Sequence, residues 1–80
     1  DDSVLPRKYR SLITIAFLIA QKSPNELKGH IRGAINNGAS VAEIREVLMH
    51  SLPHCGAPAT QEAFRAAIDI LNELEIDIDI

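Results

Sequence analysis

The chain has 80 residues, 46% of them apolar, and a formal net charge of -3. A chain of this length forms one domain, residues 1–80, whose small core is marginal. The lack of a basic face excludes a nucleic-acid binder. Cys55 is the only cysteine, which excludes a disulfide-stapled scaffold and, with no signal-peptide pattern at the start, favours the cytoplasm. Self-association is then the common remaining source of stability.

The longest apolar run is LITIAFLIA at residues 12–20, within a predicted helix over about residues 6–22. Pro6 suits the first turn of such a helix. The run is too short to cross a bilayer, which takes about 20 residues. Because it is apolar on every face, it must be covered on every face, and we expect other copies of the chain to cover part of it.

The second predicted helix begins with the motif S-x-x-E. Ser23 is the expected N-cap, Pro24 the first helical residue, and Glu26 the acid of a capping box. Gly38 is placed to take the left-handed conformation that ends a helix. The apolar residues that share one face are Leu27, Ile31, Ala34 and Ile35.

The third predicted helix repeats S-x-x-E with Ser40 and Glu43, and we expect it to end or kink at Pro53. The fourth begins near Pro58. The residues expected to face the core are Ile44, Val47, Leu48 and Ser51 in the third helix, and Phe64, Ala67, Ile68, Leu71 and Leu74 in the fourth. The fold is therefore predicted to be all-α, with short loops that make successive helices antiparallel neighbours. The final EIDIDI alternates with a period of two and fits a strand, a frayed helix or a disordered end.

Glu26 and His30 stand four residues apart on the second predicted helix. Their side chains project from the same face, near enough to share a proton or a ligand. Such a pair fits catalysis, metal binding or a surface ion pair. Glu26 is also fully explained by a capping box, and a lone histidine beside an apolar stripe is more often a hydrogen-bonded boundary residue. The spacing alone leaves these alternatives open.

His50, His54 and Cys55 are the other candidates for chemistry. They suggest a metal site only weakly, because Pro53 is expected to break the helix between the histidines and no paired C-x-x-C or H-E-x-x-H is present. A free cysteine is commonly a small buried hydrophobe. A cysteine nucleophile is disfavoured, because the side chain of the adjacent His54 should point elsewhere. We therefore expect no metal.

The segment ELKGHIRGAINNGASVAEIREVLMHSLPHCGAPA, residues 26–59, is followed by AFRAA and preceded by RSLITIA at residues 10–16. These segments resemble the carboxymuconolactone decarboxylase family, part of the alkyl hydroperoxidase D-like superfamily. The specific feature is a helix with H-x-R-G-A-x-x-N-G before a capped E-I-x-E-V-L-x-H. The resemblance implies an all-helical fold that assembles into trimers or hexameric rings, and a cytoplasmic enzyme of aromatic compound breakdown.

In the hydroperoxidase branch of that superfamily, a C-x-x-C pair and a following histidine form a thiol redox site. The resemblance places Ser23 and Glu26 at the two cysteine positions and His30 at the histidine position. A relay position that is usually Glu falls on Ser11. Disulfide exchange needs two sulfurs, so this chain cannot run that cycle within one site.

The sequence departs from the decarboxylase pattern in three ways. His54 stands where the family usually shows Tyr, Pro53 interrupts the end of the third helix, and helices often found before residue 10 are absent. The first departure bears on the choice of substrate, and the last is expected to leave a pocket open. The first residue is Asp1 rather than Met, which suggests processing, an artificial start of the chain or a missing N-terminal segment.

The namesake reaction removes CO2 from a carboxylated unsaturated lactone, whose conjugated system takes up the electrons, so we expect no cofactor. The resemblance implies that Glu26 and His30 are catalytic: His30 delivers a proton to carbon, and Glu26 orients or recharges it. The expected partners are a small carboxylate substrate and other copies of the chain, in a homotrimer or homohexamer, with neither nucleic acid nor membrane.

Four further residues are expected to bind substrate: Arg10, His50, His54 and Cys55. Arg10 is the expected charge partner, with Arg32 behind it. Arg7, Lys8 and Arg10 crowd the positive end of a helix, which is unfavourable unless an anion, or a partner's acidic tail, is nearby.

Two alternatives remain: a noncatalytic oligomeric or ligand-binding protein, and, less favoured, a thiol protein that uses Cys55 between subunits. The enzyme hypothesis requires an enclosed cavity that contains Glu26 and His30, whereas the noncatalytic hypothesis requires none.

Overall fold

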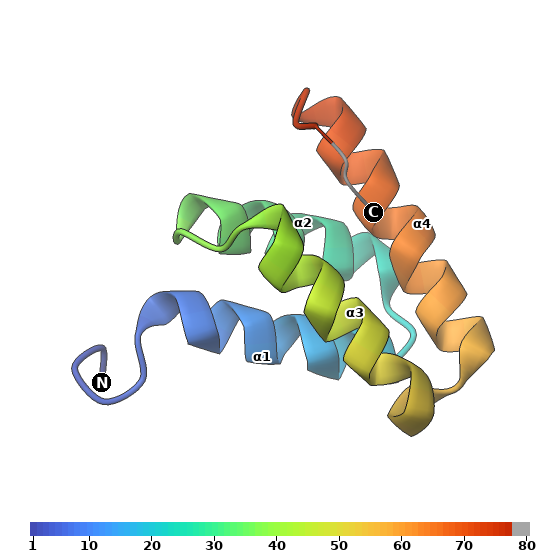
Figure 1. Ribbon diagram of the computed structural model, residues 1–80, viewed down its shortest axis with the longest axis horizontal. Coiled ribbons are helices and arrows are strands. Elements are labelled where there is room, and N and C mark those ends of the chain that lie inside the picture. Colours follow the sequence, from blue (N-terminus) through green and yellow to red (C-terminus); the bar gives the residue numbers. More distant parts are fainter. Residues whose placement is uncertain (78–80) are drawn as a thin grey trace.

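The computed structural model describes residues 1–77, which form four helices (Figure 1). These are α1 (Arg7–Ala20), α2 (Pro24–Asn36), α3 (Val41–Cys55) and α4 (Ala57–Glu73). No strand occurs within residues 1–77, which confirms the all-α prediction there. The last part of the EIDIDI tail, from residue 78, lies outside the described residues. None of the four helices has the length and apolar character that crossing a membrane requires.

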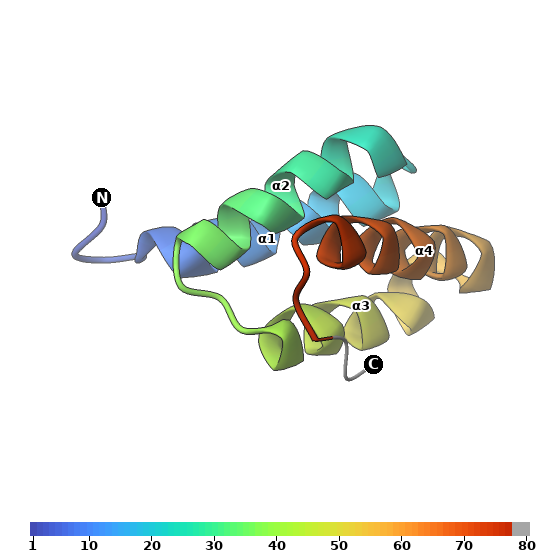
Figure 2. The ribbon, with the colours of Figure 1, turned by 90° about the horizontal axis from the view of Figure 1, so that it is seen from above.

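The helices pack as a ring in which chain neighbours are not always spatial neighbours. Helices α1 and α4 lie across the ring from each other, and both α2 and α3 pack against the two of them (Figures 1 and 2). Helices α2 and α3 barely touch. The prediction of antiparallel neighbours therefore holds for α1 with α2 and for α3 with α4, but it is wrong for α2 with α3. The short link between them passes over the core, where it buries Ala39, instead of folding α3 back beside α2.

Helix α1 buries one face in its own chain and leaves the other exposed. Ile15, Leu18 and Ile19 are buried, whereas Ile13 is 43% exposed and Phe17 is 61% exposed. An all-apolar helix in a ring of this size can be covered only on the inside. Coverage of the outer face by other copies stays a prediction.

Helix α4 presents a face of small residues to the core. Ala59, Ala63, Ala66 and Ala67 are buried on it, together with Thr60, Ile70 and Leu71. The expected core residue Ile68 is instead 37% exposed, and Phe64 and Leu74 are only partly buried. The sequence predicts a core face of α4 that is centred on its large apolar side chains. In the structure the small alanines allow α4 to lie close to its neighbours, so the buried face is rotated toward the alanines.

Pro53 lies inside α3, so the expectation that the helix ends there is wrong. The helix continues to Cys55, and Gly56, at φ 87°, ends it by donating its N–H to the Leu52 carbonyl at 3.0 Å. A proline this near the end removes only the bond that its N–H would make to the Met49 carbonyl. Met49 and Pro53 are both exposed, so water can satisfy that carbonyl.

Candidate functional site

The two S-x-x-E motifs do not behave alike. At the start of α3 the Glu43 N–H donates to Ser40 Oγ at 3.0 Å, and the Ser40 N–H donates to Glu43 Oε1 at 2.9 Å. This capping box confirms the prediction for Ser40 and Glu43. At the start of α2 no side chain caps the helix, so the capping box predicted for Ser23 and Glu26 is wrong.

The end of α1 explains the missing box. Lys22 has a left-handed φ of 55° and donates its N–H to the Ile19 carbonyl, while the Ser23 N–H donates to the Leu18 carbonyl, both at 3.1 Å. This is the paired hydrogen-bond pattern that closes a helix C-terminus. The N–H that Glu26 would have bonded is therefore already satisfied.

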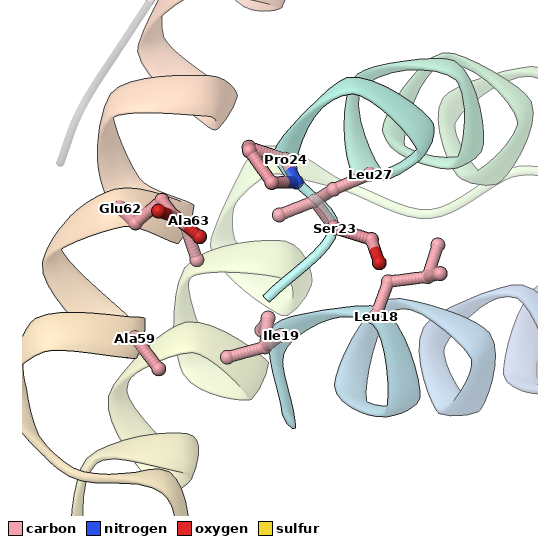
Figure 3. A pocket seen from close by; sticks show the side chains of 8 residues that line it. All are labelled: Leu18, Ile19, Ser23, Pro24, Leu27, Ala59, Glu62 and Ala63. Carbon is pink, nitrogen blue, oxygen red and sulfur yellow. The ribbon is translucent and has the colours of Figure 1, made fainter. Parts of the chain in front are cut away.

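The backbone of Ser23 also turns its hydroxyl away from α2. Its ψ is 71°, whereas the capping Ser40 has an extended ψ of 162°. Figure 3 shows the Ser23 hydroxyl directed toward Leu18 of α1 rather than along α2. The Glu26 side chain therefore makes no capping hydrogen bond.

Glu26 and His30 are both exposed on α2, one helical turn apart. Neither side chain makes a hydrogen bond or an ion pair with another residue of the described range 1–77. The structure therefore leaves a carboxylate and an imidazole one helical turn apart, with the polar atoms of both side chains unbonded. Such a pair can share or relay a proton.

The neighbours of α2 show which side the pair faces. On one side, Lys28 pairs with Asp69 of α4 at 3.4 Å. On the opposite side, Asn37 Nδ2 donates to Ser11 Oγ of α1 at 3.0 Å. Residues 26, 30, 33 and 37 follow one another at helical spacing, so Glu26 and His30 lie on the side of α2 toward α1. Ser11, the relay position, is committed to Asn37.

Two of the hollows on the surface of the described residues are well defined, and neither of these contains the pair. A crevice between the α1–α2 turn and α4 is too narrow for a water molecule (Figure 3). A groove of about 320 Å³ between α1 and α3 is lined by Leu12, Ile13, Ala16, Glu46, Val47, His50 and Ser51. Of the predicted site residues, this groove contains His50. The single chain does not place Glu26 and His30 in either hollow, so an enclosed site needs another surface against α2.

The basic residues at the start of α1 form ion pairs with carboxylates of the same chain. Asp2 forms ion pairs with Arg10 and with Arg7, the latter at 3.4 Å, and Glu43 pairs with Lys8 at 3.1 Å. The Ser40 N–H, helped by the Lys8 ammonium, holds the pKa of Glu43 below its usual range. Hydrogen bonding to Glu43 in turn raises the pKa of Lys8. The crowding of positive charge therefore gives no separate argument for a bound anion at Arg10.

His50, His54 and Cys55 gather at the end of α3. The two imidazole rings have centres 5.0 Å apart and are tilted by 58°, and both histidines are exposed. Cys55 is partly buried and packs against the core. Because α2 and α3 barely touch, this cluster and the Glu26–His30 pair are separate within one chain.

Sequence reasoning missed Glu46, which lines the α1–α3 groove one turn before His50. The spacing of four residues between them is the signal that could have found it. Ser51 lies in the same groove, but its hydroxyl donates to the Val47 carbonyl at 2.8 Å. No group of three or more His, Cys, Asp or Glu side chains lies together within the part of the chain that the structure describes.

The sequence profile of the carboxymuconolactone decarboxylase family matches residues 1–69. A nitrosuccinic acid decarboxylase, npaB, of Metarhizium robertsii is 44% identical over 70 residues, which are 88% of this chain and 49% of that protein. A 4-carboxymuconolactone decarboxylase of Acinetobacter baylyi is 39% identical over 72 residues, 90% of this chain and 54% of that protein. The chain thus spans about half the length of these curated relatives. No solved structure matches the chain with significance.

Proposed function

Because the chain belongs to the carboxymuconolactone decarboxylase family, we propose that it catalyses the loss of CO2 from a small carboxylic acid by acid–base chemistry alone. The observation that carries this proposal is the similarity to two decarboxylases over about nine tenths of the chain. Family membership alone does not fix a reaction, so the residues must supply the chemistry.

The names of the two relatives suggest the class of substrate. One describes an acid with a nitro group, and the other an acid with a lactone. Each of these groups withdraws electrons and can receive the electron pair that a departing CO2 leaves behind. We therefore propose a small acid whose carboxylate is attached next to such a group.

Glu26 and His30 are proposed to manage the proton in this reaction. The bond between the carboxylate carbon and its neighbour breaks, CO2 leaves, and the electron pair moves into the nitro or lactone group. A protonated His30 then delivers its proton to the carbon, and Glu26 holds the imidazole in place and stabilises its charged form. The absence of a capping duty for Glu26 supports this role, because its carboxylate is free to act on His30.

A second copy of the chain is proposed to enclose the site, within a homotrimer or homohexamer. Exposed Ile13 and Phe17 on α1 support this proposal, because apolar side chains of this size favour burial at an interface. Phe17→Gln should lower the association state in sedimentation while the helical content is unchanged. A parent chain that stays a folded monomer at micromolar concentration would remove this part of the proposal.

The reaction is tested by measuring CO2 release from a panel of carboxylated lactones and nitro-substituted acids. We expect at least one acid to be turned over and His30→Asn to slow it by about 10²–10⁴-fold. His50→Asn is measured beside it, because His50 is a predicted substrate-binding residue that lies in the α1–α3 groove, apart from Glu26 and His30. A loss confined to His50→Asn would move the site to that groove.

A noncatalytic, ligand-binding protein is the second candidate. It is favoured by the exposure of Glu26 and His30 and by their position outside the two hollows described above. It predicts saturable binding of the same acids with no CO2 released by any of them.

A further inference from the structure

We propose that His50 and His54 form a two-histidine site for a divalent transition-metal cation such as Zn²⁺ or Ni²⁺. The continuity of α3 makes this arrangement possible. Pro53 does not break the helix, so the two histidines stand one turn apart on a single helical face. Two histidines at this spacing are the helical part of known zinc-binding motifs.

The distance between the rings fits shared coordination of one ion. Imidazole nitrogens bind zinc at about 2.0–2.1 Å, so two rings that meet at one ion at about 90–110° have centres roughly 4.5–5.3 Å apart. The observed ring centres are 5.0 Å apart, and the rings are tilted by 58° rather than stacked. The observed separation of the ring centres therefore fits two imidazoles that bind one ion.

The surroundings of the pair suit a cation. Both histidines are exposed and make no hydrogen bond or ion pair with the other described residues, so their ring nitrogens are open to a ligand. Glu46 lies one turn before His50 on the same side of α3, with its carboxylate paired to Arg45 at 3.8 Å. The thiol of Cys55 packs against the core and is not part of the site.

The two rings leave the remaining positions of the ion to water or another small ligand. Neutral imidazole prefers ions such as Zn²⁺, Ni²⁺ and Cu²⁺ over Mg²⁺ and Ca²⁺. With two protein ligands, the site should bind less tightly than a closed structural zinc site with four. This inference does not depend on the proposed decarboxylase activity.

The test is a calorimetric titration of the full chain with ZnCl₂ in a buffer that does not chelate zinc. We expect one ion per chain, with affinity lowered at least about tenfold in His50→Gln and in His54→Gln, because even changes to groups that merely support a ligand cost about 10–100-fold. His30→Gln removes the third histidine and Cys55→Ser the thiol, and both should bind zinc like the parent. Circular dichroism checks that all four variants keep their helices.

Several outcomes would overturn the site. Parent-like affinity in His54→Gln would do so, as would loss of binding in Cys55→Ser or one ion bound per two chains. A second measurement does not rely on the variants: Cu²⁺ bound to the Cys55→Ser chain should show nitrogen coupling from two imidazoles in its electron paramagnetic resonance spectrum. Coupling from a single imidazole nitrogen would mean that only one histidine binds the ion, which would also contradict the proposal.

Discussion

Helices α2 and α3 begin with the same four-residue motif, S-x-x-E, but only α3 uses it as a capping box. Ser40 follows the link between α2 and α3 and has an extended backbone. No backbone carbonyl of the described residues accepts its N–H, which is therefore available to Glu43. Ser23 comes directly out of the turn that closes α1, with its N–H already bonded to Leu18. One half of a capping box uses the N–H of the cap residue, so that half cannot form where the preceding turn already uses this N–H.

The same difference separates the two glutamates. Glu43 is tied to the Ser40 backbone and to Lys8, and its pKa is lowered accordingly. Glu26 is free of such ties and stands one turn from His30. Glu43 therefore has a structural role, whereas the catalytic role of Glu26 stays a prediction, although a motif search treats the two residues as equal.

The largest expected difference is in rate. Glu26→Gln should lower the rate of CO2 release by about 10²–10⁴-fold, because a positioned acid–base group contributes that much. Glu43→Gln is the matched control and should retain the parent's rate. The comparison uses steady-state kinetics on whichever acid of the panel is turned over. Equal rates in the two variants would show that Glu26 has no part in proton transfer.

The next difference is in stability. Ser40→Ala should lower the free energy of unfolding by about 0.5–2 kcal/mol, the usual cost of losing an N-cap. Ser23→Ala should leave it nearly unchanged, because the Ser23 side chain makes no capping hydrogen bond. Urea unfolding of both variants at one protein concentration measures the contrast. A similar loss at Ser23 would mean that α2 is capped in solution after all.

A smaller difference should appear with pH. The folded pKa of Glu43 is depressed, so its stabilisation is present above the pKa of the unfolded chain and is lost as the pH falls through the folded pKa. The gap in unfolding free energy between the parent and Glu43→Gln should therefore close on acidification from neutral pH. A gap that is constant from neutral to acid pH would contradict the ionised capping box.

The smallest effect is expected at Lys8. Its raised pKa means that its contribution is present below the unfolded pKa and is lost as the pH rises through the folded pKa. Lys8 and Glu43 are partly solvated, so Lys8→Gln should cost much less than Ser40→Ala. That cost should vanish in about 1 M salt, where exposed charges are screened. A loss that persists at high salt would indicate packing of the Lys8 stem instead.

Helix positions were the part of the fold that the sequence predicted best. The spacing of apolar residues and the start and stop signals at Pro24, Gly38 and Ser40 are local features of the sequence. Local features suffice to predict where helices lie. The route of the link from α2 to α3 was not predictable from local signals, because it depends on the burial of Ala39 in the core against residues distant in sequence. The exposure of Ile68 was missed for a related reason, since an alanine face carries little periodic signal.

For the candidate site, the sequence placed Glu26 and His30 on one helical face, which α2 confirms. Their roles stay predictions. Spacing could not reveal that the Ser23 N–H is used by α1, because that bond is set by the left-handed turn at Lys22. Nor could it show that Pro53 leaves His50 and His54 on one continuous helix.

The crossing link between α2 and α3 divides the chain into two helical hairpins of similar size. Each hairpin joins its own helices by a short turn, so contacts inside it are local and should form early in folding. Contacts of α1 with α3 and of α2 with α4 come later, when the hairpins dock. The hairpins meet through the same surfaces whichever copy supplies them, so two chains that exchanged hairpins could keep the contacts between hairpins, and only the link with the buried Ala39 would have to move. Changes in residues 37–40 should therefore alter the balance between a closed chain and a swapped pair.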